Sequence, residues 1–441
     1  MKDLLCGAAK AIITPKQEWV THLQCMNMTF GGILDDILVR TIAIGNGEST
    51  MLFVGYDLDM EPYPEESIVW ITSHTNVPEE NIFLFGTHTH AVPRLGPRKY
   101  EPRFHHQNLT EEDLSILQAY ESYVLESMHS TVLQAIESMR PARFGVGRAP
   151  CYITSNRTET FTWTDSEGNP RESTQIGFNP EGPVDHTVFT MKFEDLEGNM
   201  IACLVNYAVH CAALFPNELA NGKLAVTSDI GGNVSHLIEA KTPDCVAIWS
   251  AAPSGDVNPI MMNAFTYRNP VDGSPVQAEL HGDTRHILNF SVARHYAVVE
   301  ELLNTISCDR DRADISGAMA LVELPLKKAE RTKTGWIVSS EPSETPYQIR
   351  LHYVSFGDLA FCGVGGELFT RHGWIMQEAL PIDLVIITHD HEQSHNAGYI
   401  GDDDGLRLHA HGTKGGLAPG LVGPALKESL QKMYLSCINV P

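Results

Sequence analysis

Residues 183–210 read PVDHTVFTMKFEDLEGNMIACLVNYAVH, and this stretch contains two strand-like segments joined by a tight turn. The segments 187–193 and 199–208 are rich in β-branched and aromatic residues, as strands are. The sequence DLEGN at 195–199 lies between them and predicts an antiparallel hairpin. The second segment ends in Asn-Tyr-Ala-Val-His, so His210 is expected just beyond the end of a strand.

Strand-like and helical segments alternate along the rest of the chain. A second hairpin is expected at 356–359, and Thr110 is expected to cap a helix over 110–138 because acidic residues follow it. Mixed parallel and antiparallel strands with intervening helices predict an α/β fold, with mixed β-sheets flanked by helices. Further strands are expected at 37–45, 50–57, 81–86, 245–250, 347–355, 359–364 and 382–387, and further helices at 64–75, 228–240, 283–306, 367–379 and 420–435.

The 441 residues are enough for one large domain or for two ordinary ones. No linker, repeat or charge block divides them, so a single domain over 1–441 is expected. The least patterned stretches, 92–109, 155–184 and 253–282, are rich in Gly, Pro, Asn and Arg. Such long irregular stretches in a compact domain predict loops that form a functional site.

The charge balance excludes several classes of partner. Lys and Arg number 31 against 55 Asp and Glu, a formal charge of -24, which repels nucleic acid and anionic membranes. No apolar run reaches the roughly 20 residues of a spanning helix, so no stable membrane insertion is expected. The first residues, MKDLLCGAAK, lack the features of a signal peptide, which predicts a cytoplasmic protein. The sequence defines no oligomeric state.

Nine cysteines are present, an odd number without any CxxC pair, which predicts free buried thiols rather than disulfides or cysteine-bound zinc. Histidine is more informative, because 20 are present and many are close together in sequence. Imidazole is the commonest nitrogen ligand of metals and titrates near neutral pH, so the clusters direct attention to metal or proton chemistry. The clusters are His88 with His90, His105 with His106, His389 with His391 and His395, and His409 with His411.

The sharpest of these clusters is GTHTH at 86–90, directly after the apolar segment 81–85. Alternate residues of a strand point to the same face, so His88 and His90 are expected to face one site. One of them would bind a metal while the other handles protons. The alternative is a pair of structural, hydrogen-bonded histidines.

Two further residues complete a possible ligand set. His210 follows a strand, although an isolated histidine there is more often structural. Glu367 follows Gly365 and Gly366 at the start of a predicted helix, where its alternative role is to offset the helix dipole. Two imidazoles and one carboxylate are nevertheless the ligands of many catalytic zinc sites, in which an open position carries an activated water.

Other motifs are absent or uninformative. The sequence THDHE at 388–392 resembles the HxHxD pattern of metallo-β-lactamase-like enzymes, but it is strongly polar and lacks a second Asp-His pair, so a solvated loop is expected. There is no GxSxG, P-loop or GxGxxG motif, which argues against a serine-elbow hydrolase, an NTPase and a Rossmann dehydrogenase.

In their order along the chain, the segments resemble the N-terminal catalytic domain of the neutral (non-lysosomal) ceramidase family. The resemblance extends from residue 7 to about residue 435. It is carried by GTHTHAVP (86–93), Asn156-Arg157, the stretch 183–210, SDIGG (228–232), GDVNP (255–259), GVGGELF (363–369) and Gly398-Tyr399-Ile400.

The resemblance implies a zinc centre with His88, His210, Glu367 and Tyr399 as ligands, and with His90 and Arg157 lining the site. Zinc lowers the pKa of a bound water to about 7, which makes hydroxide available. His90 would then move a proton between this water and the leaving amine. Arg157 would stabilise an oxyanion or bind a substrate carboxylate.

The chain departs from the family pattern at two positions. Asn258 stands where GDVSP has a serine proposed as nucleophile, and an amide forms no acyl-enzyme, so direct attack by zinc hydroxide is the remaining mechanism at this site. Asp402 follows Tyr399 where the family has further tyrosines, which makes it an alternative fourth ligand. A C-terminal immunoglobulin-like domain has no expected counterpart.

The predicted function is therefore that of a zinc-dependent hydrolase that cleaves a linear amide in a small, soluble N-acyl compound. One alternative is a catalytically inactive homologue that binds a metal or a small molecule. The other is a zinc-dependent esterase or lactonase that acts on a soluble substrate such as a carbohydrate derivative.

Overall fold

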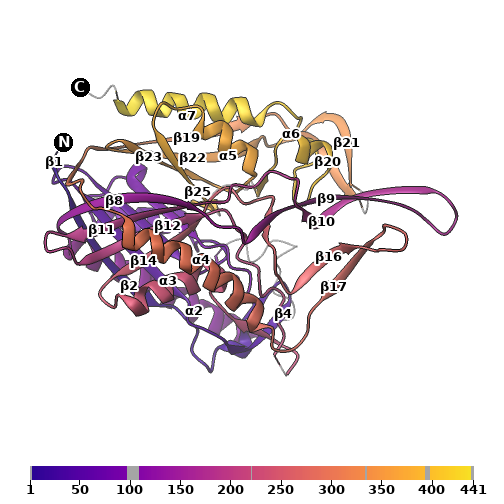
Figure 1. Cartoon of the computed structure of the whole chain (residues 1–441), viewed down its shortest axis with the longest axis horizontal. Helices are drawn as coiled ribbons and strands as arrows, with labels where there is room; N and C mark the ends of the chain where they lie inside the picture. Colours follow the sequence, from indigo (N-terminus) through magenta and orange to yellow (C-terminus); the bar gives the residue numbers. More distant parts are fainter. Residues whose placement is uncertain (1, 97–108, 220, 333–334, 393–397, 439–441) are drawn as a thin grey trace.

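The computed structural model describes residues 2–96, 109–219, 221–332, 335–392 and 398–438. Two β-sheets pack face to face, and helices cover both outer faces (Figure 1). In the described residues the larger sheet has eight strands, in the spatial order β14 (Val246–Ala251), β12 (Met200–Tyr207), β11 (Thr187–Asp195), β8 (Arg140–Pro150), β2 (Leu5–Ile12), β5 (Leu38–Gly45), β6 (Thr50–Tyr56) and β7 (Ile82–Gly86). The smaller sheet is made of β19 (Ile315–Leu324), β22 (Tyr347–Phe356), β23 (Leu359–Val364) and β25 (Asp383–Thr388).

The core between the sheets is aromatic. The ring of Phe53 in β6 stacks on Phe83 of β7 at 5.0 Å and meets Phe361 of β23 edge-on at 5.1 Å. These rings are fully buried, so they hold the sheets together across the centre of the molecule.

Helices cover the outer faces of the two sheets. The helix α2 (Glu111–Glu137) packs on β2 and β5, and α3 (Asp229–Lys241) and α4 (Arg285–Thr305) cover the end of the larger sheet near β14 and β11. The helices α5 (Thr370–Gln377) and α7 (Val422–Ile438) cover the smaller sheet (Figure 1). The prediction of an α/β fold with mixed sheets flanked by helices is confirmed.

Three strand–helix–strand units position the functional side chains. In each unit a helix connects two parallel neighbours: α1 (Pro64–His74) connects β6 to β7, α3 connects β12 to β14, and α5 connects β23 to β25. Asn206 of β12 donates hydrogen bonds to Ser250 of β14 and to the carbonyl of Ile386 in β25, each at 3.0 Å, and so links the second unit to the third. Ligand sites form beyond the carboxyl ends of parallel strands, which is where the segments after β7, β12 and β23 begin.

The predicted hairpins at 195–199 and 356–359 are confirmed as antiparallel pairs β11–β12 and β22–β23. Thr110 caps α2 as expected, in a capping box with Asp113. All nine cysteines are buried and free, as predicted. Within the described residues, no helix is both long and apolar enough to cross a bilayer.

The prediction that 155–184 and 253–282 are irregular loops is wrong. Both contain hairpins that extend from the body of the molecule (Figure 1). The strands β10 and β17 are half exposed or exposed throughout, and β9 begins with buried polar residues, so a sustained apolar alternation that would mark these strands is missing. In the third predicted loop, residues 97–108 lie outside the described residues. The hairpin strands are β9 (Thr154–Thr164) with β10 (Pro170–Asn179), and β16 (Ala264–Arg268) with β17 (Pro275–Glu279).

The remaining elements are short or lie at the edges. The strands are β1 (Lys2–Asp3), β3 (Gln24–Cys25), β4 (Met28–Ile33), β13 (Leu224–Val226), β15 (Val257–Pro259), β18 (Arg312–Ala313), β20 (Lys327–Thr332), β21 (Gly335–Pro342), β24 (Glu367–Leu368) and β26 (Tyr399–Ile400). The helical segments are η1 (Val20–His22), η2 (Glu79–Asn81) and α6 (Asp403–Arg407).

A buried histidine in the core makes the stability of the fold sensitive to acid. The Nε2 of His295 on α4 accepts a hydrogen bond from Trp249 Nε1 at 3.0 Å, so the ring must be neutral, and burial lowers its pKa to about 3. The unfolded chain, with a histidine pKa near 6.5, binds a proton that the folded chain does not, so stability falls as the pH drops from 6.5 towards 3. At pH 5 we expect this histidine alone to cost about 2 kcal/mol.

The variant His295→Gln retains an acceptor for Trp249 but has no proton to gain. Its free energy of unfolding, measured in urea at pH 7 and pH 5, should therefore fall less with acid than that of the wild type. An unchanged pH dependence would show that His295 is not one of the groups that cause it.

Candidate metal centre

Two imidazoles and a carboxylate meet at the end of the larger sheet. The Nε2 atoms of His88 and His210 lie 3.3 and 3.2 Å from the same oxygen, Oε2 of Glu367. His88 follows β7, His210 follows β12, and Glu367 lies in β24 shortly after β23, so each comes from just beyond a strand of one strand–helix–strand unit. Glu367 precedes α5, which begins at Thr370, so the alternative that it offsets the helix dipole from the first turn is wrong.

The hydrogen bonds of the two rings fix where their protons lie. The Nδ1 of His88 is 3.1 Å from the carbonyl of Asp59, and the Nδ1 of His210 is 2.9 Å from the carbonyl of Ser254. A carbonyl only accepts, so both Nδ1 atoms carry the proton, and in the neutral rings both Nε2 atoms present lone pairs. Glu367 Oε2 is also an acceptor, and within the part of the chain that the structure describes none of these three buried atoms has a hydrogen-bond partner.

The protonation states suit metal binding. Burial favours the neutral acid of Glu367, but His88 and His210 hold its pKa well below the usual range. Burial, and then the charge of Arg157, lower the pKa of His210 to about 3. At neutral pH the site thus presents an ionised carboxylate and a neutral imidazole, the forms that bind metal. Histidines that bind metals usually donate a hydrogen bond from the ring nitrogen that does not bind the metal, often to a carbonyl. The Nδ1 atoms of His88 and His210 do so, and these residues therefore fit a divalent cation.

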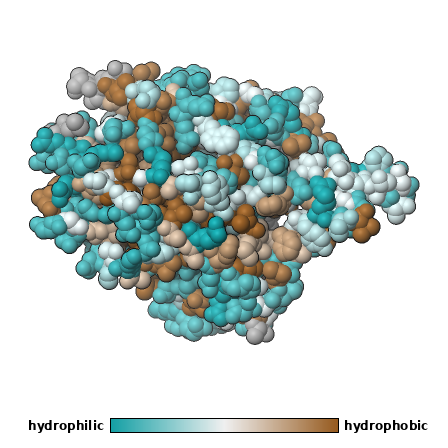
Figure 2. All heavy atoms as spheres, viewed as in Figure 1, coloured by the Kyte–Doolittle hydropathy of each residue, from teal (hydrophilic) through white to brown (hydrophobic). Residues whose placement is uncertain are grey.

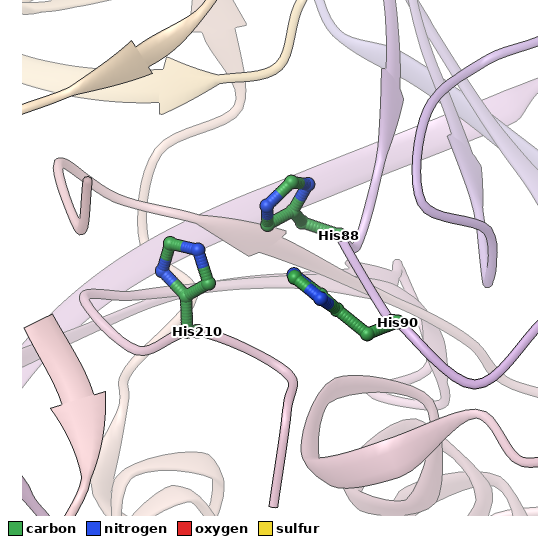
Figure 3. A group of neighbouring side chains, drawn as sticks. All are labelled: His88, His90 and His210. Carbon is green, nitrogen blue, oxygen red and sulfur yellow. The ribbon is translucent and has the colours of Figure 1, made fainter. Parts of the chain in front are cut away.

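His90 brings a third imidazole to the site. One nitrogen from each of His88, His90 and His210 lies within 4.8 Å of the others, and the three rings converge in Figure 3. The His90 Nε2 has no hydrogen-bond partner in the described ranges, and desolvation of the ring together with the two neighbouring imidazoles lowers its pKa well below 6.5.

The predicted reason for this convergence is wrong, because β7 ends at Gly86 and the two histidines do not alternate along a strand. Instead, His88 has a left-handed backbone with φ of 58°, and the backbone N–H of His90 donates to the carbonyl of Cys211.

Tyr399 and Arg157 lie beside the carboxylate. The strands β24 and β26 pair in parallel, with Glu367 opposite Tyr399. The Tyr399 hydroxyl accepts a hydrogen bond from Arg157 Nη2 at 3.0 Å, and burial raises the pKa of the phenol, which is therefore neutral. The same Nη2 lies 4.0 Å from Glu367 Oε2. Tyr399 is therefore placed to complete the predicted ligand set.

The guanidinium of Arg157 is largely occupied by the protein itself. Its Nε and Nη2 donate to the carbonyl of Gly255 at 3.2 and 2.7 Å, and its Nη1 donates to Asn258 Oδ1 at 3.0 Å. Asn258 is thus part of the site, held between Arg157 and the sulfur of Met262. Asp402, the alternative fourth ligand, instead caps α6 through the N–H of Gly405 at 2.7 Å. The structure places Tyr399, and not Asp402, beside Glu367.

The prediction that 388–392 is a solvated loop is wrong, because all five residues are buried. The segment continues from β25 alongside β7, where Asp390 Oδ1 accepts from the N–H of Leu84 and the N–H of His391 donates to the Leu84 carbonyl, each at 2.9 Å. The ring of His389 stacks on that of His88 at 3.9 Å. Backbone groups of β7 thus form hydrogen bonds with this segment, whose polar sequence had predicted exposure to solvent. His105, His106 and His395 lie outside the described residues.

Comparisons with known proteins agree with this architecture. The crystal structure of neutral ceramidase from Pseudomonas aeruginosa matches 99% of this chain and 74% of its own, with a TM-score of 0.70 at 16% identity. The chain has the neutral ceramidase fold. A structure described as ceramidase complexed with C2 gives a TM-score of 0.71 at 14% identity, over 99% of this chain and 75% of its own.

In sequence, neutral ceramidase B from Dictyostelium discoideum is 26% identical over 213 residues, which is 45% of this chain and 26% of that protein. The match thus spans about a quarter of the curated relative. No protein-family profile matches the chain. The resemblance to neutral ceramidases stated from the sequence is confirmed.

In this ceramidase-like fold the histidines open into a cavity of about 520 Å³. Its walls combine apolar side chains, among them Phe215, Met262 and Phe265, with the cations Arg94 and Arg331. A second cavity of about 560 Å³ lies along the projecting hairpins and shares Asn258 and Phe265 with the first. Figure 2 shows hydrophobic residues gathered where these hairpins leave the body.

The roles of three contributors to the site were not predicted from the sequence. Asp59 and Ser254 act through backbone carbonyls, which no side-chain motif reveals. Gly255 lies so close to Glu367 that a Cβ atom would sit 2.4 Å from the Glu367 carbonyl oxygen, so only glycine fits. The signal available for Asp59 was its place after the predicted strand 50–57, at the same sheet end as the histidines.

Proposed function

We propose that this protein hydrolyses a linear amide in a small N-acyl compound, with a zinc ion held by His88, His210, Glu367 and Tyr399. The supporting observation is that two imidazole lone pairs and a carboxylate oxygen converge in a buried place, and that none of the three atoms has a hydrogen-bond partner among the described residues. A bound zinc ion would supply an electrophile and lower the pKa of a water to about 7. The neutral ceramidase fold agrees with such a hydrolase.

The other side chains have separate roles in this proposal. His90 Nε2, which lies beside both ligand rings and has no partner among the described residues, takes a proton from the attacking water and gives it to the leaving amine. Arg157 has five N–H groups, of which four are engaged, so a single Nη1 hydrogen is left for a developing oxyanion. Asn258 provides no nucleophile, and its amide instead helps to hold Arg157.

The cavity favours a substrate with an apolar part and a polar or anionic part. The apolar walls suit an acyl group, whereas Arg331 suits a polar end, since the other lining arginine, Arg94, is ion-paired with Asp59. The formal charge of -24 disfavours an anionic membrane surface as the place of reaction. We therefore propose a soluble small-molecule substrate.

Metal removal tests the proposal. Purified protein should hydrolyse members of a panel of N-acyl amino acids and fluorogenic amides, lose at least about 1000-fold in kcat/KM after chelation, and recover with added zinc. Turnover that is unaffected by chelation, or protein that contains no metal, would contradict a metal-dependent reaction.

Asn258 supports a second candidate, because a protein without the family's serine is also consistent with loss of catalysis or with a change to ester or lactone substrates. Matched ester and amide pairs separate these possibilities. Hydrolysis of the amide excludes the inactive homologue, turnover of esters alone favours the esterase or lactonase, and tight metal binding without any turnover favours the binding protein.

A further inference from the structure

A second group of metal-binding side chains lies outside the centre described above. His352 is in β22, and Asp390 and His391 follow β25. All three are at most 1% exposed, and one ligand atom from each lies within 4.8 Å of the others. The polar segment 388–392, whose burial the sequence did not predict, thus contributes two residues that the proposed hydrolysis does not use.

The hydrogen bonds of His352 place two acceptor atoms, its own Nδ1 and Asp390 Oδ2, close together without a hydrogen to share. Its Nε2 lies 2.6 Å from the carbonyl of Glu80 and must donate to it, so in the neutral ring Nδ1 presents a lone pair. That lone pair lies 3.2 Å from Oδ2 of Asp390. An aspartate is ionised at neutral pH, so Oδ2 is an acceptor as well. Either a proton or a cation must lie between the two atoms.

His391 favours the cation. Its Nδ1 lies 3.5 Å from the same Asp390 oxygen, and among the described residues neither of its ring nitrogens has a partner that meets hydrogen-bond geometry, although the side chain is fully buried. A proton on His352 would satisfy the His352–Asp390 pair but would leave His391 with only the 3.5 Å approach of its Nδ1 to Asp390. Buried polar atoms are rarely left without a partner. A cation bound to Nδ1 would give His391 such a partner.

We propose that His352 Nδ1, Asp390 Oδ2 and His391 Nδ1 hold a second, structural zinc ion. The two nitrogen–oxygen distances of 3.2 and 3.5 Å bracket the separation of about 3.3 Å between neighbouring ligands that are each about 2.0–2.1 Å from a tetrahedral zinc. The N–H of His352 bound to the Glu80 carbonyl is the outer hydrogen bond that metal-bound histidines usually make.

The residues around this group let the Asp390 carboxylate approach the β23 backbone closely and hold it there. A Cβ atom on Gly363 of β23 would lie 2.0 Å from Asp390 Oδ2, so glycine is needed for the carboxylate to occupy this place. The other oxygen, Oδ1, is fixed by the N–H of Leu84 in β7. The ion would connect β22 to the segment after β25, and through Asp390 to β7. No ligand is exposed, so its role would be structural.

Metal content tests this inference separately from the proposed function. The double variant His88→Ala/Glu367→Gln removes two ligands of the first centre and none of the second. After native purification with a chelator in the buffer, mass spectrometry of the metal should find about one zinc per chain in the double variant. Adding His391→Gln to it should reduce this to near zero. Release of the ion should require unfolding in denaturant with chelator.

His295→Gln in the double-variant background is the matched control, since His295 is also fully buried but lies in neither group. It should retain one zinc. A double variant with no zinc would overturn the second site, whatever the wild type binds. Should the His391→Gln protein fail to fold, X-ray absorption of the double variant decides instead, with two imidazoles on the zinc expected and a shell of water alone contradicting the site.

Discussion

Exchanging Glu367 for glutamine is expected to lower kcat/KM at least about 1000-fold, because the amide removes the one anionic ligand of the proposed zinc. The carboxylate oxygen now lies 3.2–3.3 Å from two imidazole nitrogens that present lone pairs to it. A neutral amide neither offsets the charge of a divalent ion nor binds it as strongly. Metal affinity should fall by more than about 100-fold, since even loss of an outer-shell partner costs 10–100-fold.

Glu121→Gln is a suitable control for this variant. Glu121 on α2 is also buried, at 5% exposure against 7% for Glu367, but it does not line the cavity. Activity and zinc titration should be unchanged in Glu121→Gln and lost in Glu367→Gln, while circular dichroism shows both variants to be folded. Full activity in Glu367→Gln would exclude the proposed centre.

The position of the first centre was largely predictable from local sequence. His88, His210 and Glu367 each follow an apolar strand, and parallel strands with helical connections place such ends together. The periodicity of the strands and helices was therefore sufficient to indicate the sheet end. It was not sufficient for the orientation of His88, whose left-handed backbone replaces the expected alternation along a strand.

The burial of 388–392 was not predictable in this way, for a physical reason. Five polar residues in a row read as a solvated loop unless distant groups satisfy them. Here the satisfying groups are the N–H and carbonyl of Leu84, about 300 residues earlier in the chain, and the carboxylate of Asp390 meets His352 from another strand. Only the tertiary structure brings these partners together. The hairpins at 154–179 and 264–279 were missed for a different reason, since their projecting parts bury too little to show an apolar pattern and the buried start of the first hairpin is polar.

Arg157→Lys is expected to lower kcat/KM by about 100-fold or more while the protein keeps its zinc. The planar guanidinium contacts the Gly255 carbonyl, Asn258 and the Tyr399 hydroxyl at once. An ammonium has three donors around one point and cannot span these three acceptors. His88, His210 and Glu367 remain to hold the metal. Arg148→Lys, a change at an exposed ion pair with Asp383, is the control and should have normal activity.

The same variant distinguishes the two roles suggested for Arg157 by the sequence. A bidentate grip on a substrate carboxylate needs two free N–H groups, and only one Nη1 hydrogen is unengaged. We therefore expect Arg157→Lys to slow an N-acyl amino acid and its carboxamide analogue by the same factor, mainly in kcat. A loss confined to the carboxylate substrate, and seen in KM, would instead show that Arg157 turns away from its protein partners to bind substrate.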